Sequence, residues 1–356
     1  MTTQTLIHSN AFNFLSFVQG SVDPRTGFYS LAIALPELPA NHLSGPNLPL
    51  SLRYNPLNIQ DSGFGVGWSL NLTQFDVTTG MLGLHTGESF KVADNGPGQT
   101  AVIPERKIDS FHFENVSEGA HKRVRIAHKS GLIEVLEPQA PDYTVALPVR
   151  VLAASGHGIS LSYRVVNGAP CLETITDDTL LDGRPRTLLA IDYSGNAQVK
   201  IDLNPGTEAF ARYTLERSGD ELGKVVLPTA DQACWAFTYR RVGELRCLTA
   251  MQTPVGAREV IEYKDDGHAL PGGQGRTVPY VRRHVISPGA GQPDVERHYA
   301  FSSNNFLGNG TGVSWDNDGL DNLYKFTGSR FVYSSTASHY QDGAALRTIT
   351  REFNRF

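Results

Sequence analysis

Residues 158–165 read GISLSYRV, in which the apolar residues Ile159, Leu161, Tyr163 and Val165 alternate with small or polar ones. Successive side chains of a β-strand point to opposite faces, so this period of two predicts a strand with one buried face. The same alternation returns at 27–35, 48–54, 132–136, 187–193, 197–203, 209–216, 235–240 and 258–263.

Clusters of Gly, Pro, Asn, Asp and Ser separate these segments, as turns do. They lie at 94–98, 166–168, 193–196 and 264–267. We therefore expect an all-β chain, an elongated and curved antiparallel sheet of consecutive hairpins with little or no helix. The only helix candidate, 9–18, fits an extended strand equally well.

Composition supports the same class and excludes several others. Charged residues make up 19% of the 356 residues, below the roughly 25% of ordinary domains, and 35 Gly and 20 Pro supply turn chemistry. The net charge of −5 and the lack of a long basic run argue against nucleic acid as a partner. The N-terminus lacks the basic start of a signal peptide, and no window of 18 apolar residues predicts a membrane-spanning segment.

A weak repeat runs through the strands: an apolar residue, a polar residue, a Tyr and usually another polar residue. It occurs at 52–55 (LRYN), 161–164 (LSYR), 191–194 (IDYS), 237–240 (FTYR) and 261–264 (IEYK), and more weakly at 211–214 (ARYT). Each unit is a strand, a turn and a strand that ends in Tyr, and it cannot bury its apolar face alone. Stacked units that share one sheet and one core are the expected result.

These units resemble the tyrosine–aspartate repeats of the Rhs (YD-repeat) family. The opening is also similar to the start of an Rhs shell, at 22–29 (VDPRTGFY), 43–55 (LSGPNLPLSLRYN) and 63–70 (GFGVGWSL). Further likeness, shared with the B and C components of insecticidal toxin complexes, lies at 263–268, 288–293, 305–308 and 321–324. The resemblance covers nearly the whole chain.

The resemblance implies a β-sheet strip that spirals into a hollow shell around a toxic polypeptide encoded in the same or a partner chain. We expect residues 1–20 to be an N-terminal segment that leads into the shell, and 21–356 to be shell, incomplete at its C-terminal end. The expected partners are the toxin, the remaining shell and a secretion-system component. We expect synthesis in the cytoplasm, export by a dedicated system and no enzymatic activity.

The stretch 61–71, DSGFGVGWSLN, sets Gly63, Gly65 and Gly67 at every second position beside Phe64 and Trp68. It could be a phosphate-cradling loop, a flexible linker or a sheet corner where another backbone comes close. No Lys-Ser or helix follows, as a phosphate loop requires, and linkers rarely carry Phe and Trp. We predict a strand with the glycines on one face and the large side chains on the other.

We expect no catalytic, cofactor or metal site. The residues expected to set curvature and register are Gly63, Gly65, Gly67, Trp68, Tyr54, Tyr163, Tyr193, Tyr239 and Tyr263. Because aromatic faces also bind sugar rings, a carbohydrate-binding β protein with exposed Tyr and Trp is the alternative. A propeller or sandwich hydrolase is a weaker third hypothesis.

Four patterns suggest other chemistry, and each has a simpler interpretation. The acidic stretch 315–321 fits a solvated turn better than calcium, because it lacks EF-hand spacing. Ser155 to Gly158 predicts a hairpin turn, and adjacent Asp177 and Asp178 would point to opposite faces of a strand. His268, His284 and His298 lack zinc-site spacing and are expected to be surface or hydrogen-bonded histidines.

Overall fold

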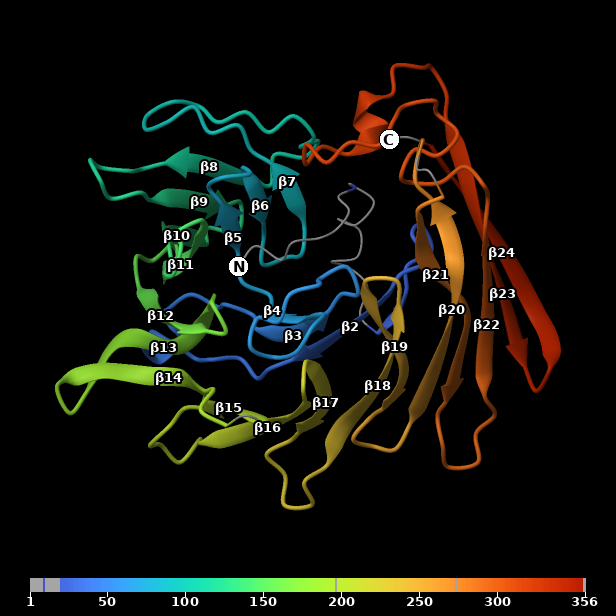
Figure 1. The fold of residues 1–356 in the computed structure, drawn as a ribbon. Helices are drawn as coiled ribbons and strands as arrows, with labels where there is room; N and C mark the ends of the chain where they lie inside the picture. The colour runs from blue at the N-terminus through green and yellow to red at the C-terminus, as the bar shows by residue number, and fades with distance from the viewer. Residues whose placement is uncertain (1–8, 10–19, 196, 273–274, 355–356) are drawn as a thin grey trace. The chain divides into compact units, whose positions relative to one another are not determined.

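The computed structural model describes residues 9, 20–195, 197–272 and 275–354. It divides into two compact units, whose strands are labelled in Figure 1. Unit 1 holds 33–53 and 60–232, and unit 2 holds the described residues up to 32 together with 54–59 and 233–354. Almost all of the predicted N-terminal segment 1–20, including the helix candidate 9–18 except for residue 9, lies outside the described residues.

The described residues form strands and only two short 3-10 segments, η2 (Asn41–Leu43) and η3 (Asn322–Lys325). The first three strands are β1 (Ser21–Val22), β2 (Tyr29–Ala34) and β3 (Ser51–Tyr54). Strand β1 belongs to unit 2, whereas β2 and β3 each have residues in both units. No helix in the described part is long and apolar enough to cross a bilayer.

Unit 1 contains the strands from β4 to β17. They are β4 (Trp68–Leu70), β5 (Gln74–Asp76), β6 (Met81–Gly83), β7 (Ser89–Lys91), β8 (Phe111–Asn115), β9 (Val124–His128), β10 (Ile133–Pro138), β11 (Val145–Leu152), β12 (Gly158–Val166), β13 (Ala169–Leu181), β14 (Arg184–Asp192), β15 (Gln198–Leu203), β16 (Ala211–Ser218) and β17 (Glu221–Val226). From β8 to β17 each strand pairs antiparallel with the next.

Unit 2 continues in the same manner. Its strands are β18 (Cys234–Val242), β19 (Leu245–Gln252), β20 (Arg258–Ala269), β21 (Thr277–Ser287), β22 (Val295–Phe301), β23 (Val332–Gln341) and β24 (Ala344–Asn354), each paired antiparallel with the next. The predicted all-β class, with consecutive antiparallel hairpins and little helix, is confirmed.

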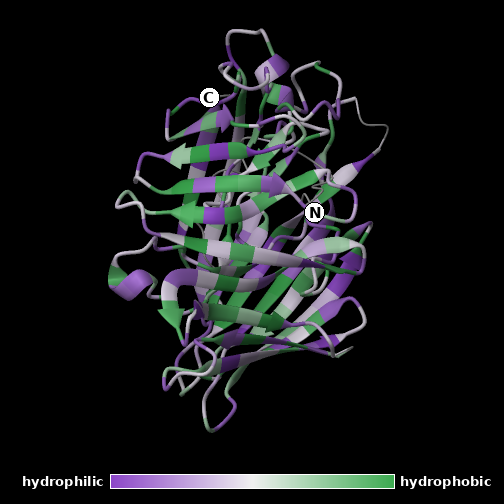
Figure 2. Cartoon of the chain, turned by 90° about the vertical axis from the view of Figure 1, so that its left-hand side faces the viewer, coloured by the Kyte–Doolittle hydropathy of each residue, from purple (hydrophilic) through white to green (hydrophobic). Residues whose placement is uncertain are grey.

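Alternation along the strands builds the core. In β15, Val199, Ile201 and Leu203 are buried while the residues between them are not, and Figure 2 shows hydrophobic and hydrophilic residues alternating along the strands. In unit 1 β5 pairs with both β6 and β11, which brings the short strands β5 to β7 against β8 to β11 around one hydrophobic cluster. Its largest members are Phe75, Phe90, Phe111 and Phe113.

One predicted turn is wrong. Residues 264–267 lie inside β20, which continues to Ala269 and pairs with β21 on both sides of this segment. The register shifts between Lys264 and His268, so the extra residues form a bulge in the strand. A side chain at Gly267 would come within 2.5 Å of the Val278 carbonyl oxygen, which explains a glycine there without a chain reversal.

Candidate functional site

The glycine stretch forms a loop that ends at β4, and the predicted strand through 63–67 is wrong. Gly63, Gly65 and Gly67 have φ of +95°, +102° and +90°, a backbone region that side chains disfavour. The cause is local: Asp61 Oδ1 accepts hydrogen bonds from the N–H groups of Gly63 (2.9 Å) and Gly65 (2.8 Å). The chain therefore curls around its own carboxylate instead of extending.

The close approach of another backbone, the second part of the prediction, is present in this loop. A Cβ on Gly65 would lie 2.8 Å from the Leu222 amide nitrogen, and Val66 N–H donates to the Asp220 carbonyl at 2.8 Å. A Cβ on Gly63 would meet the Tyr193 ring at 2.7 Å. The loop is thus pressed onto the β16–β17 turn of its own unit, and Trp68 at its end is fully buried.

An ion pair neutralises the loop. The Arg217 guanidinium donates to Asp61 Oδ2 and, at 2.9 Å, to the Gly63 carbonyl. Both side chains are largely buried, with 11% of Arg217 and 19% of Asp61 exposed. The amide donors that a phosphate would need at Gly63 and Gly65 are already bound to a carboxylate. The loop is therefore structural, and its bonds between Asp61, the glycine amides and Arg217 are here called the clasp.

Three of the repeat tyrosines make one recurring contact, here called the tyrosine hook. Each hydroxyl donates to a backbone carbonyl of a neighbouring strand: Tyr163 to Pro148 (2.7 Å), Tyr193 to Leu172 (2.9 Å) and Tyr263 to Leu248 (2.9 Å). In each case the accepting residue lies beside a register shift, where one residue of its strand is skipped in the pairing. The hook thus fixes the irregular point of a strand pair.

The repeat motif itself marks these points. Tyr163 and Tyr239 follow the register shifts of their own hairpins and face Leu172 and Leu248, the residues that the next tyrosines hook. Tyr54 adds a second bond at the same place, since its hydroxyl donates to Arg246 O (2.6 Å) and accepts from Leu248 N (2.8 Å). Bulges increase strand twist, so a hooked bulge is a means to hold it.

All five repeat tyrosines are buried or half-buried, and Tyr54 and Tyr263 are buried outright. Burial raises the pKa of the hydroxyls of Tyr54, Tyr163, Tyr193 and Tyr263 well above the ordinary value. These hydroxyls are therefore neutral donors to carbonyl oxygens across the ordinary pH range.

The other weighed residues have ordinary partners. Lys325 Nζ lies 3.3 Å from Asp316 and 2.8 Å from Asp318 in the acidic stretch 315–321. Asp177 accepts from Arg186 and Asp178 from Arg150. Among the histidines, His268 is buried against the Thr26 carbonyl, His284 is buried against Glu259, and His298 is exposed beside Glu296.

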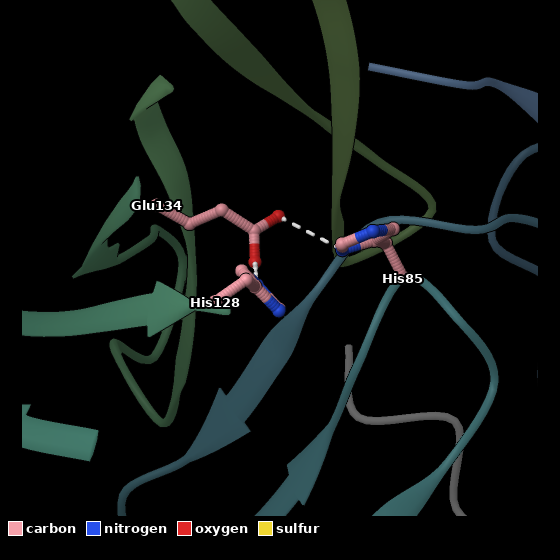
Figure 3. Close-up of side chains that lie close together, drawn as sticks. All are labelled: His85, His128 and Glu134. Atoms are coloured by element: carbon pink, nitrogen blue, oxygen red, sulfur yellow. Dashed lines mark hydrogen bonds and ion pairs between the residues drawn. The ribbon is translucent and has the colours of Figure 1, made fainter. Parts of the chain in front are cut away.

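The structure also assembles a polar cluster that the sequence did not single out, formed by His85, His128 and Glu134 (Figure 3). His85 lies in the turn between β6 and β7, His128 ends β9, and Glu134 is the second residue of β10. One potential ligand atom from each lies within 4.8 Å of the others. No sequence motif joins them: the pairing of β9 with β10 brings His128 close to Glu134, and the β6–β7 turn adds His85.

Glu134 is the centre of the cluster. Its Oε2 lies 2.8 Å from His128 Nε2 and accepts from Thr73 Oγ1 at 2.6 Å, while its Oε1 lies 3.5 Å from His85 Nδ1. Burial alone would raise the pKa of Glu134, but its bonds to His128, His85 and Thr73 lower it to about 2. The carboxylate is therefore ionised inside the protein, where such a charge requires compensation.

Comparison with known proteins gives only distant matches. No family model and no curated protein matches the chain. A solved structure of TcdB2-TccC3 and another of TcdB2-TccC3 without its hypervariable C-terminal region are each 15% identical to this chain, with a TM-score of 0.37, and cover 85% and 78% of it. The chain spans less than a fifth of their length, 18% and 16%.

A porin-like protein from Bacteroides uniformis is 12% identical with a TM-score of 0.30. It covers 75% of this chain, which spans 98% of its length. At these scores the comparisons assign no activity or partner.

Proposed function

We propose that this chain is a non-enzymatic segment of a β-shell of the Rhs/YD-repeat kind, which encloses or chaperones a toxic polypeptide. The observation that carries the proposal is the tyrosine hook. The same contact recurs at three strand pairs, two in unit 1 and one in unit 2, as expected of residues that build a wall. A binding or catalytic site would instead gather different residues at one place.

The hook also gives a physical reason for the repeat. A shell needs a sheet that twists steadily, and a bulge adds local twist at the expense of ladder hydrogen bonds. A tyrosine hydroxyl that binds the carbonyl beside a bulge compensates for part of that loss. The resemblance of the opening and the repeats to Rhs shells supports the same function.

The lack of a proposed active site rests on the contacts of the candidate acids. Asp177 Oδ2 is bound to Arg186 and to the amide of Asn41, and Asp178 is bound to Arg150 and to the amide of Gly158. Charges committed to such pairs are poor proton donors or nucleophiles at neutral pH. Sugar binding through the repeat tyrosines has less support, because the hydroxyls of Tyr54, Tyr163, Tyr193 and Tyr263 already bind the backbone.

As partners we propose the toxic polypeptide, in the same or a partner chain, and the remaining shell. We further propose that the chain is made in the cytoplasm and exported by a dedicated secretion system or toxin complex. The toxin would then act in competition between bacteria or against another target.

The test is protection of a cargo. The chain is co-expressed with the polypeptide encoded directly downstream and the complex is digested with a low concentration of protease. We expect the downstream polypeptide to co-purify and to resist digestion for longer than the same polypeptide alone. Equal digestion with no co-purification contradicts the shell, and selective binding on a glycan array would favour the carbohydrate alternative instead.

A further inference from the structure

We propose that His85, His128 and Glu134 bind one zinc ion, which ties the β6–β7 turn to strands β9 and β10. The three residues supply two imidazole nitrogens and one carboxylate oxygen, a ligand set that zinc uses with a fourth position left for water. The site is independent of the proposed shell function, because it rests on residues outside the tyrosine hooks.

The spacing of the ligand atoms suits a single ion. Zinc bonds of about 2.0–2.1 Å in a tetrahedral site place neighbouring ligand atoms about 3.3 Å apart. Glu134 lies 2.8 Å from His128 Nε2 through one oxygen and 3.5 Å from His85 Nδ1 through the other. All the potential ligand atoms lie within 4.8 Å of one another, so movements of the three side chains alone would bring them around one metal ion.

The carboxylate has an unused bonding capacity in the protein interior. The Glu134 side chain is fully buried, and among the described residues its Oε1 has only the 3.5 Å contact with His85 Nδ1 and no hydrogen bond of good geometry. A buried carboxylate oxygen that no donor binds closely is costly, and native proteins seldom keep one without a reason. Oε1 is also the oxygen that points toward His85 (Figure 3), so a cation between the two groups would satisfy it.

A supporting residue holds the ligands in place. Thr73, which directly precedes β5, donates from its hydroxyl to Glu134 Oε2 at 2.6 Å, and the same hydroxyl oxygen accepts from the backbone N–H of His85 at 3.0 Å. The His85 and His128 rings lie edge to face with centroids 4.9 Å apart. Outer groups that orient both a carboxylate and a histidine are typical of metal sites.

The direct test is zinc binding by the full chain after treatment with a chelator and dialysis. Isothermal titration is expected to show one Zn²⁺ per chain, with a higher melting temperature of the loaded protein. Cobalt in place of zinc should give the visible absorption bands of a site with nitrogen and oxygen ligands. Unmodified chain that binds no zinc, or that retains Fe²⁺ but not Zn²⁺, overturns the proposal.

Matched variants separate this cluster from surface histidines. Glu134→Gln keeps the shape but removes the charge, and should weaken zinc binding at least about 100-fold, while Thr73→Val should weaken it by about 10- to 100-fold. His112→Ala and His121→Ala remove exposed histidines of the same unit and should bind zinc as the unmodified chain does.

Circular dichroism confirms that each variant is folded. If Glu134→Gln unfolds, His85→Ala decides, since His85 lies in a turn. Equal zinc affinity in the unmodified chain and in a folded cluster variant overturns the site, as does loss of binding only in His112→Ala or His121→Ala.

Discussion

Two loops of this protein, one in each unit, fold in the same way around the carboxylate of an aspartate. In unit 1, Asp61 accepts the N–H groups of Gly63 and Gly65. In unit 2, Asp23 accepts those of Arg25 (2.8 Å) and Thr26 (2.7 Å). Each carboxylate binds amides that follow it closely in the chain and so folds the backbone around itself, as aspartate does in turns.

Both loops also place a glycine of positive φ against a strand or turn of their own unit. A Cβ on Gly65 would lie 2.8 Å from the Leu222 amide nitrogen, whereas a Cβ on Gly27 (φ +71°) would meet the side chains of Tyr280 and Phe301. One backbone hydrogen bond of 2.8 Å fixes each contact, from Val66 to Asp220 and from Val281 to the Gly27 carbonyl.

The loops differ in how the negative charge of the aspartate is compensated. Arg217 pairs with Asp61, while the guanidinium of Arg25 turns to the Tyr333 hydroxyl and burial raises the pKa of Asp23 above its ordinary value. A buried carboxylate can thus be held by amide bonds either as a paired ion or as a group whose charge is disfavoured. The two loops should therefore respond differently to mutation of their aspartates.

The largest expected effect is from Gly65→Ala. A side chain there must adopt an unfavourable φ and also displace the Leu222 backbone, so we expect a loss of about 3 kcal/mol or more in the free energy of unfolding. Equilibrium denaturation in urea measures it. Gly96→Ala is the control, because Gly96 has a similar φ of +94° with nothing within 4 Å.

The control should lose only about 1–2 kcal/mol, the cost of the backbone angle alone. Equal losses in both variants would show that the close approach of Leu222 to Gly65 contributes nothing.

These loops also mark how far the sequence can predict the fold. Alternation in segments such as 158–165 and 197–203 located the strands, because burial of one face is a local pattern. The glycine stretch imitates that pattern, but a backbone angle is not visible in a hydrophobic alternation. The signal that could have corrected it is Asp61, placed two and four residues before Gly63 and Gly65, the spacing at which a carboxylate reaches backbone amides.

The second prediction compares the two aspartates. Asp61→Asn keeps an oxygen for the glycine amides but leaves Arg217 without its partner in a largely buried site, so we expect a loss of about 2–3 kcal/mol. Asp23→Asn should stay within about 1 kcal/mol of the unmodified chain, because burial already disfavours the charge. Urea denaturation of both variants at pH 7 measures the difference, and a larger loss for Asp23→Asn would reverse our interpretation.

The third prediction concerns pH and the Asp23 loop alone. Its Thr26 carbonyl is 3.0 Å from His268 Nε2, and burial lowers the pKa of His268 from 6.5 to about 4. The folded protein thus binds this proton less readily than the unfolded chain. Stability is complete above pH 6.5 and is lost as the pH falls toward about 4, by up to about 1.4 kcal/mol per pH unit.

Denaturation of the unmodified chain and of His268→Gln at several pH values measures this slope, which should be shallower in the variant. Asp23 acts in the opposite direction, since its raised pKa makes the folded state the better proton acceptor. The Asp23→Asn background therefore isolates His268. Identical pH profiles with and without His268 would refute the prediction.

The candidate zinc ligands show a different limit of sequence reasoning. Zinc motifs are recognised by ligands that lie close together in the sequence, as in two histidines on one helical face. His85, in contrast, is far from His128 and Glu134 in the chain. The register of β9 with β10 and the position of the β6–β7 turn bring them together. A pattern search cannot detect a site that only strand pairing creates. The tyrosine motif was visible because the sequence repeats it at several hairpins.

The smallest expected effect is the loss of single tyrosine hooks, one in each unit. Tyr193→Phe and Tyr263→Phe remove only the donors to Leu172 and Leu248, and each should cost about 0.5–1.5 kcal/mol, the usual value of one hydrogen bond.

Tyr193→Ala should cost more, because the Tyr193 ring also covers Gly63 and lies 5.9 Å from the Phe64 ring. It is therefore expected to loosen the Asp61 loop, seen as faster hydrogen exchange of the Gly63 and Gly65 amides, while Tyr193→Phe leaves that exchange unchanged. If Tyr193→Phe and Tyr193→Ala increase this exchange equally, the Tyr193 hydroxyl stabilises the Asp61 loop as well as the bulge at Leu172. The tyrosine hook and the loop would then be one structural unit.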